Sequence, residues 1–226
     1  MGRPSCGRSH LNRFLEAGPQ RIASRRPSAS LRYTTNENYC GRYRSGYRHA
    51  GEGGFAASAM AKGAKVMLIE PSRRMQRVIR QLFMLRSLGE PCLFEYLLGD
   101  VYAQTQFFED IGNPGASRAA PGRIADTYTV EMLTLDEFAA RHLQRGVTYI
   151  KCDAEGWDCK ILKSGRALLQ KYRPKISVTT YHNQTDYRDI SDFLYGLNYS
   201  CSGKGLLYSS GLLRTLMLHA VPHVRA

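Results

Sequence analysis

From residue 51 onward, short apolar stretches alternate with longer segments of helical periodicity, and this alternation limits the possible folds more than any other feature. Apolar runs of about five residues bounded by Gly, Pro or Asp are typical of buried strands, and the segments between them are long enough for crossover helices. Such alternation implies βαβ units, whose strands lie parallel in one sheet. The sequence therefore predicts an α/β fold with a mostly parallel, doubly wound sheet.

The individual elements follow from apolar period and from capping residues. Ser72 is a candidate N-cap for a helix that Gly89 ends. Residues 101–126 contain several glycines and prolines, so we expect a loop or an insertion there. We expect strands at residues 65–69, 93–98, 128–133, 147–150 and 175–181, helices at residues 55–63, 73–88, 134–144, 158–171 and 187–197, and a closing antiparallel pair at residues 199–202 and 213–220.

The N-terminal segment differs in composition from the rest of the chain. Residues 1–48 are rich in Arg, Ser, Gly and Pro and have no sustained apolar period, which predicts disorder. Residues 1–50 carry ten arginines against Glu16 and Glu37, whereas the remaining residues carry 22 basic and 17 acidic side chains. A basic tail on an ordinary body gives little reason to expect a nucleic-acid partner. We therefore divide the chain into a disordered or misassigned basic segment, residues 1–48, and one folded domain, residues 49–226.

Composition also limits the expected cellular location of the protein and the chemistry of its cysteines. No apolar run reaches the roughly 18 residues that a membrane span needs, and the N-terminus lacks the apolar core of a signal peptide. We therefore expect a cytoplasmic protein without a membrane partner. The cysteines have no C-x-x-C spacing, so we expect reduced structural thiols and no metal site; they are Cys6, Cys40, Cys92, Cys152, Cys159 and Cys201.

Polar residues follow several of the expected strands. In a doubly wound sheet, ligands bind at the carboxyl ends of the strands. The glycine cluster Gly51, Gly53 and Gly54 precedes a helix and would let the backbone approach a nucleotide. Glu70, at the end of the next strand, could accept two hydrogen bonds from ribose hydroxyls, and Asp100 follows a third strand, where an adenine amino group is often met. A plain turn and solvated strand-end carboxylates are the alternatives, and the pattern suits either NAD or S-adenosyl-L-methionine.

The later segments distinguish these two cofactors by a resemblance. Three blocks resemble the core of the FkbM family of methyltransferases: Thr134-Leu135-Asp136, Lys151-Cys152-Asp153-Ala154-Glu155-Gly156 and Leu162-Lys163-Ser164-Gly165. Residues 63–71 match the family's second strand, and residues 175–182, ending in Tyr-His, look like its fifth. The resemblance spans about residues 50–220 and implies a Rossmann-like class I methyltransferase. It also implies methyl transfer from S-adenosyl-L-methionine to a hydroxyl of a small molecule or sugar.

A hydroxyl acceptor must lose its proton, which requires a base near the methyl group. Asp153 and His182 are the candidate bases, and Glu155 would orient the substrate or Lys151. The alternatives are that Asp153 and Glu155 cap the following helix, that His182 is a satisfied strand-end histidine, or that Asp, Glu and His bind a metal. We expect Asp153, Glu155 and His182 to be catalytic, and no metal to take part.

The sequence departs from the family at the first strand. The family opens with an apolar strand and an acidic, glycine-containing turn, whereas residues 43–50 contain neither an apolar run nor an acid. The first strand is therefore degenerate or missing, and its loss would expose the inner edges of two buried neighbours. A catalytically inactive, methyltransferase-like binding module and a nucleotide-dependent oxidoreductase thus remain alternative functions. The sequence contains no motif for the methyl acceptor.

Overall fold

The computed structural model describes residues 38–42, 51–108, 118–120, 127–209 and 211–223. By its internal contacts the chain divides into a unit of residues 1–32 and a unit of residues 33–226, and all the described residues belong to the second. Across these described ranges, no helix combines the length and apolar character that a bilayer crossing requires.

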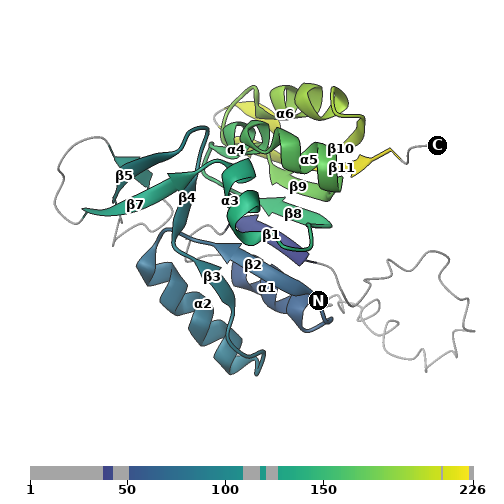
Figure 1. Cartoon of the computed structure of the whole chain (residues 1–226). Coiled ribbons are helices and arrows are strands. Elements are labelled where there is room, and N and C mark those ends of the chain that lie inside the picture. The colour runs from purple at the N-terminus through teal and green to yellow at the C-terminus, as the bar shows by residue number, and fades with distance from the viewer. Residues whose placement is uncertain (1–37, 43–50, 109–117, 121–126, 210, 224–226) are drawn as a thin grey trace, which may run out of the picture. The chain divides into compact units, whose positions relative to one another are not determined.

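A seven-stranded sheet with the order β10-β11-β9-β8-β1-β2-β3 forms the centre of this unit (Figure 1). Its first five strands along the chain run parallel, and β11 runs antiparallel to β9 and β10. This arrangement confirms the predicted α/β doubly wound sheet with an antiparallel C-terminal strand pair. The strands are β1 Asn38–Arg42, β2 Lys65–Ile69, β3 Cys92–Phe94, β8 Tyr149–Cys152, β9 Lys175–Thr179, β10 Tyr199–Ser209 and β11 Leu212–Pro222.

Helices cover both faces of this sheet. In β2, Val66 and Leu68 pack with α1 and α2, whereas Ile69 packs in the larger core with the helices from α3 to α6. Since successive side chains of a strand point to opposite faces, the two groups of helices lie on opposite sides of the sheet. The helices are α1 Gly51–Met60, α2 Arg73–Leu85, α3 Leu135–His142, α4 Asp158–Ser164, α5 Arg166–Tyr172 and α6 Asp186–Tyr195.

Two helix starts were readable in the sequence, and both are confirmed. The hydroxyl of Ser72 accepts a hydrogen bond from the Met75 main-chain N–H at 3.1 Å. Thr134 and Glu137 form a reciprocal capping box at the start of α3. The single helix expected at residues 158–171 is instead two helices, α4 and α5, which meet at Gly165.

A second, four-stranded sheet has the order β4-β7-β5-β6. Its strands are β4 Tyr96–Leu98, β5 Ala103–Phe108, β6 Arg118–Ala120 and β7 Thr127–Leu133. One prediction was therefore wrong, because residues 93–98 form two strands in different sheets. Residues 101–126, expected to be a loop or an insertion, include β5 and β6. The reason is a separate small core of Leu97, Phe107, Val130 and Met132, which the polar sequence around Phe107 conceals.

The first strand is present. β1 pairs in parallel with β2 on one side and with β8 on the other, at the centre of the main sheet. Its sequence, Asn-Tyr-Cys-Gly-Arg, is polar for a central strand, so the strand is degenerate rather than missing. β1 also extends the folded domain to the N-terminal side of the boundary predicted at residue 48; residues 1–37 lie outside the described residues.

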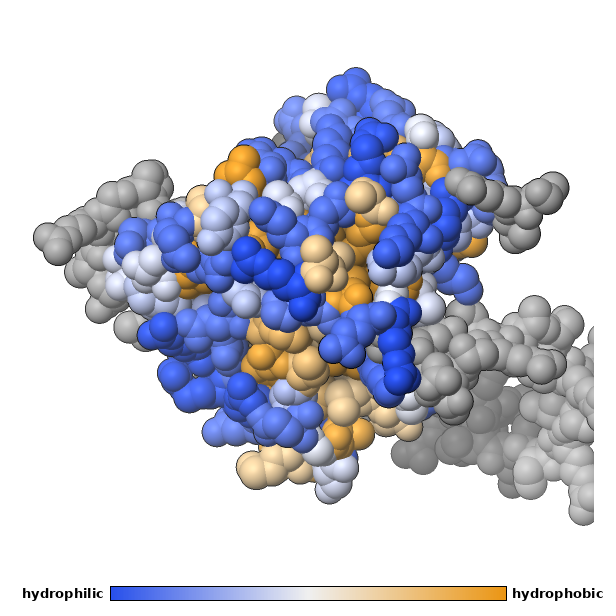
Figure 2. All heavy atoms as spheres, in the orientation of Figure 1, coloured by the Kyte–Doolittle hydropathy of each residue, from blue (hydrophilic) through white to orange (hydrophobic). Residues whose placement is uncertain are grey.

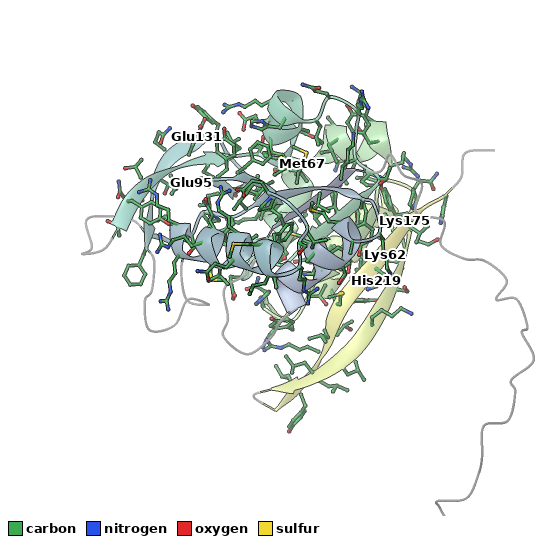
Figure 3. The ribbon with its side chains drawn as sticks, turned by 90° about the horizontal axis from the view of Figure 1, so that it is seen from below. Lys62, Met67, Glu95, Glu131, Lys175 and His219 are labelled. Carbon is green, nitrogen blue, oxygen red and sulfur yellow. The ribbon has the colours of Figure 1, made fainter. Side chains whose placement is uncertain are left out.

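The C-terminal hairpin is longer than the sequence predicts. β10 and β11 each contain 11 residues, and Figure 3 shows them extending beyond the neighbouring strands. Leu206, Tyr208 and Leu213 near its end are exposed.

Figure 2 shows that polar residues cover most of the visible face, with apolar residues in a strip across its middle.

Candidate active site

The register of β1 sets the positions of the candidate residues. Gly41 of β1 pairs with Leu68 of β2 and with Lys151 of β8. Glu70 and Asp153, each two residues further along, therefore lie at the same edge of the sheet on either side of β1. With neighbouring strands about 5 Å apart, roughly 10 Å separates the two positions. The strand order reverses between β1 and β8, and this switch point is where doubly wound sheets bind ligands.

Glu70 is held inside the turn that follows β2. Its side chain is buried, with 3% of the residue exposed, and Oε1 accepts a hydrogen bond from the Ser72 main-chain N–H at 2.8 Å. Tyr128 fixes the same turn from the second sheet, since its hydroxyl donates to the Pro71 carbonyl at 2.7 Å and accepts from the Arg73 N–H at 3.1 Å. Glu70 is therefore not the solvated strand-end carboxylate of the alternative interpretation.

The glycine cluster forms the first turn of α1. Gly51, Gly53 and Gly54 lie within the helix rather than in a turn before it, which corrects the sequence prediction. A Cβ at Gly54 would meet no atom within 4 Å. Because α1 connects β1 to the parallel strand β2, its N-terminus lies at the carboxyl edge, where the first N–H groups of a helix can bind a ligand.

Asp100 has a different setting from the one expected. It follows β4 of the second sheet, because the chain leaves the main sheet after β3. Its Oδ2 lies 3.2 Å from Nζ of Lys160 in α4, and its side chain is 44% exposed. The ion pair between Asp100 and Lys160 thus joins the end of β4 to α4, the helix that follows the Lys-x-Asp-x-Glu-Gly block.

Asp153 is buried at the end of β8 and has two partners. The Thr179 hydroxyl donates to Oδ1 at 3.0 Å, and Nζ of Lys151 lies 3.7 Å from Oδ2. Lys151 therefore pairs with Asp153 itself. Both carboxylate oxygens face a proton donor of this chain.

His182 brings the predicted catalytic residues together. Its Nε2 lies 3.5 Å from Glu155 Oε2 and 4.0 Å from Asp153 Oδ1. Its side chain is only 10% exposed, yet neither ring nitrogen makes a well-formed hydrogen bond with a described residue. Buried polar atoms in this condition are rare in folded proteins, so the ring is not the satisfied histidine of the alternative interpretation.

Asp158 is a residue that the sequence analysis did not single out. It is fully buried at the start of α4, where Oδ1 accepts from the Ala154 N–H at 2.9 Å and Oδ2 from the Gly156 N–H at 3.3 Å. Oδ2 also lies 3.5 Å from Nδ1 of His182. Burial alone would raise the pKa of the Asp158 carboxyl, but the His182 ring and the Ala154 N–H outweigh burial and hold this pKa below its usual value.

The loop between β8 and α4 is shaped by these contacts. Glu155 and Gly156 adopt left-handed backbone conformations, with φ of 52° and 87°. The carboxylate that binds the loop N–H groups is Asp158, and the N-cap residue of α4, Trp157, makes no side-chain cap bond. The structure therefore does not support the interpretation that Asp153 and Glu155 cap this helix. The only sequence signal for Asp158 was an acidic residue directly after Gly156 and Trp157.

A second buried acid supports the loop from the other side. Asn183 donates from Nδ2 to the Gly156 carbonyl at 3.1 Å and to Asp186 Oδ1 at 3.1 Å. Burial raises the pKa of the Asp186 carboxyl, although the Asn183 hydrogen bonds act in the opposite direction. Within the part of the chain that the structure describes, no group of three or more His, Cys, Asp or Glu residues is arranged to hold a metal ion.

The comparisons with known proteins agree with this architecture. Residues 39–201 match the methyltransferase FkbM domain. No curated protein matches the sequence. Among solved structures, the FkbM methyltransferase from Methylobacillus flagellatus KT is 20% identical, with a TM-score of 0.54 over 84% of this chain and 44% of that chain. This chain thus spans less than half the length of that relative.

More distant similarity extends to other methyltransferases. Magnesium protoporphyrin IX methyltransferase from Synechocystis PCC 6803, solved with bound S-adenosylmethionine, is 12% identical, with a TM-score of 0.45 over 82% of this chain and 69% of that chain. The family match covers well over half of the sequence, from β1 into β10, and includes every candidate site residue. This chain belongs to the FkbM methyltransferase family.

Proposed function

We propose that this protein transfers a methyl group from S-adenosyl-L-methionine to a hydroxyl oxygen of a small molecule or sugar. The observation that carries the proposal is that Glu70, Asp153 and His182 follow parallel strands of one sheet and meet the edge where its strand order reverses. The glycine-rich first turn of α1 begins at the same edge. A donor site and a proton acceptor would thus lie together at one switch point.

The residues present fit the methyl donor. Glu70 is a buried carboxylate at the end of β2, the position at which a doubly wound sheet binds ribose hydroxyls. The N-terminus of α1 offers main-chain N–H groups, and we propose that Gly51, Gly53 and Gly54 let the donor approach the backbone. Asp100 would bind the adenine amino group. S-adenosyl-L-methionine supplies an electrophilic methyl group when it is bound.

The chain's own residues would prepare the acceptor. We infer that His182 is the base, because its ring nitrogens lack well-formed hydrogen bonds, whereas Asp153 is engaged by Thr179 and Lys151. Glu155, 3.5 Å from His182 Nε2, would orient the acceptor hydroxyl. The hydroxyl proton moves to Nε2 as the oxygen takes the methyl group, and the donor leaves as a neutral thioether. Positioning of the two reactants supplies much of the rate of such an in-line displacement.

Calorimetry with the full chain tests donor binding. S-adenosyl-L-methionine and its demethylated product should bind, and NAD should not. Glu70→Gln should weaken binding by about 10- to 100-fold, since it removes a charged hydrogen-bond acceptor. Glu90→Gln, a surface carboxylate paired with Arg80, is the matched control and should bind normally. Tight binding of NAD would instead support the oxidoreductase.

Acceptor identity requires a turnover experiment. The protein and labelled donor are incubated with a metabolite extract, and mass spectrometry detects products that gain one methyl group. Products that carry the label on oxygen would support the proposal. Donor binding without any labelled product across varied extracts would favour the catalytically inactive binding module.

A cytoplasmic location is part of the proposal. The side chains of Cys92, Cys152, Cys159 and Cys201 are free thiols, as expected of a reducing compartment. Cell fractionation with the native chain tests this, and recovery in a secreted fraction would contradict it.

A further inference from the structure

The two ring nitrogens of His182 face different carboxylates, and these carboxylates differ in burial. Nδ1 faces Asp158, whereas Nε2 faces Glu155 and, at a longer distance, Asp153. Asp158 is fully buried, and Asp153 and Glu155 lie nearer the edge of the sheet, where the acceptor would enter. One nitrogen thus points into the protein and the other towards the proposed acceptor.

Three hydrogen bonds hold the Asp158 carboxylate in place independently of His182. Oδ1 accepts from the Ala154 N–H at 2.9 Å and from the Thr179 hydroxyl at 3.2 Å, and Oδ2 accepts from the Gly156 N–H at 3.3 Å. These donors come from the loop after β8 and from the end of β9. They leave Oδ2 facing His182 Nδ1 at 3.5 Å. That distance is at the long limit of a hydrogen bond, and catalytic hydrogen bonds of this kind commonly shorten when the reactants bind.

We propose that Asp158 is a positioning residue: it accepts the proton of His182 Nδ1 and so keeps the neutral ring in the tautomer whose Nε2 lone pair faces the methyl acceptor. The inference rests on the proposed function of the site. Only one ring nitrogen of a neutral histidine carries a proton, and the partner of that nitrogen decides which one. When the acceptor hydroxyl gives its proton to Nε2, Nδ1 keeps its own proton and the ring becomes a cation between Asp158 and Glu155.

Glu155 lies as close to Nε2, at 3.5 Å, as Asp158 lies to Nδ1, but the Glu155 side chain is 28% exposed, whereas that of Asp158 is fully buried. Asp153 and Glu155 face Nε2, Lys151 pairs with Asp153, and Asp186 packs behind the loop through Asn183. Asp158 is thus the carboxylate within 4 Å of Nδ1 among the described residues. Its removal should change the tautomer, whereas a change at Asp186 should not.

Long-range nitrogen NMR on the labelled full chain measures the tautomer directly. The two ring nitrogens have separate chemical shifts, and the His182 signals are assigned by their loss in His182→Gln. In the wild type we expect the Nδ1–H tautomer to exceed the other by about tenfold or more, as a hydrogen bond to a charged carboxylate provides. A neutral wild-type ring that carries its proton on Nε2 would overturn the proposal, whatever the variants do.

Asp158→Asn should reverse the tautomer. The Asn oxygen is expected to stay with the two donors on the Oδ1 side, which turns the amide NH₂ towards Nδ1 and forces the ring proton onto Nε2. Asp186→Asn makes the same chemical change in another buried carboxylate and should keep the wild-type tautomer, because Asp186 acts on the ring only at longer range. If Asp158→Asn keeps the wild-type tautomer, Asp158 does not position the ring.

The positioning role of Asp158 and the proposed function of the site are tested by different measurements. Calorimetry with S-adenosyl-L-methionine tests the proposed function without reference to the tautomer. Donor binding and methyl transfer combined with an Nε2–H ring would overturn only the positioning role. Absence of donor binding would overturn the proposed function and, with it, the catalytic meaning of the tautomer.

Discussion

The carboxyl ends of β8 and β9 are joined by hydrogen bonds between buried side chains, whereas the end of β2 is organised around Glu70 and the main chain of one turn. In the first region, Asp158 binds N–H groups of the loop after β8 and also the Thr179 hydroxyl of β9. In the second, Glu70 binds the N–H of Ser72, two residues further on. The proposed acceptor side is therefore preorganised by side chains from separate strands, and the proposed donor side by one turn whose main chain binds Glu70 and the hydroxyl of Tyr128.

The difference explains where the sequence signal is strong. A loop held by buried acids needs particular residues at fixed spacing, which gives the readable block from Lys151 to Gly156. A central strand held by main-chain pairing needs no particular side chains, so β1 could be polar and still pair with β2 and β8. The comparison predicts large effects of substitution around Asp158 and smaller ones on the donor side.

The largest effect is expected for Asp158→Ala. The substitution leaves the Ala154 and Gly156 N–H groups without their acceptor and removes a buried carboxylate, so the free energy of unfolding should fall by about 3–5 kcal/mol. Urea unfolding measures this change from the transition midpoint. Asp192→Ala, at an exposed position on α6, is the control and should change stability by less than about 0.5 kcal/mol. Equal effects of the two substitutions would contradict the preorganised acceptor side.

The role of Asp158 could not be predicted from the sequence. Its role depends on left-handed residues Glu155 and Gly156, which fold the loop back over the start of α4, and on Thr179, which is distant along the chain. The first relation depends on left-handed backbone conformations, one of them at a non-glycine residue, and the second joins residues 21 positions apart, so no period or spacing predicts either. Ser72 and Thr134, by contrast, cap helices within three residues of their own positions; sequence alone identified Ser72 as a cap and placed the other helix start at Thr134 or Asp136.

The second sheet could not be predicted from the sequence for a related reason. Half of the residues of β5, Ala-Gln-Thr-Gln-Phe-Phe, are polar, and within the strand only Phe107 is buried. Its strand character comes from pairing with β6 and β7 rather than from an apolar face. The parallel sheet was predictable because its strands are buried on both faces and therefore read as apolar runs.

The pH dependence of stability should separate the two buried acids of the acceptor side. The pKa of Asp158 is lowered in the folded state, so its contribution is fully present above the unfolded pKa of about 3.9 and is lost as pH falls through the folded value. The pKa of Asp186 is raised, so its contribution is present at low pH and is lost as pH rises through the folded value. Urea unfolding measures the free energy of unfolding between pH 7 and pH 3. As the pH falls, this free energy should decrease less steeply in Asp158→Asn than in the wild type, and more steeply in Asp186→Asn. Parallel profiles would show that neither carboxyl titrates as assigned.

Gly165→Ala should destabilise the acceptor side to an intermediate extent. A Cβ at this junction of α4 and α5 would lie 2.5 Å from Cδ2 and 3.0 Å from Cβ of the buried Leu135. Overpacking of this kind should lower the free energy of unfolding by about 1–3 kcal/mol. Gly196→Ala is the control, because its nearest atom would lie 3.4 Å away in ordinary contact. A destabilisation by the control as large as that by Gly165→Ala would rule out the Leu135 contact as the cause.

Gly54→Ala should act in the opposite direction on the donor side. The added methyl meets no atom within 4 Å and lies in a helix, so stability should rise by about 0.5–1 kcal/mol. If the donor approaches the backbone here, its affinity should fall by about tenfold or more, the effect of one misplaced methyl group in a close-fitting site. Thermal unfolding and calorimetry are measured together. Ser58→Ala, exposed on the same helix, should leave donor affinity unchanged, and normal affinity in Gly54→Ala would remove this turn from the donor site.

The smallest effect on stability is expected at Asp100, where the two regions meet through the ion pair with Lys160. Both side chains are largely exposed, so Asp100→Asn should change the free energy of unfolding by less than about 1 kcal/mol, and less at high salt. Lys160→Gln breaks the same ion pair but keeps the carboxylate, which makes it the matched control. If Asp100 binds the donor, calorimetry should show weaker affinity in Asp100→Asn alone. Equal loss in both variants would mean that the ion pair orders the turn after β4, and unchanged affinity in both would remove Asp100 from the donor site.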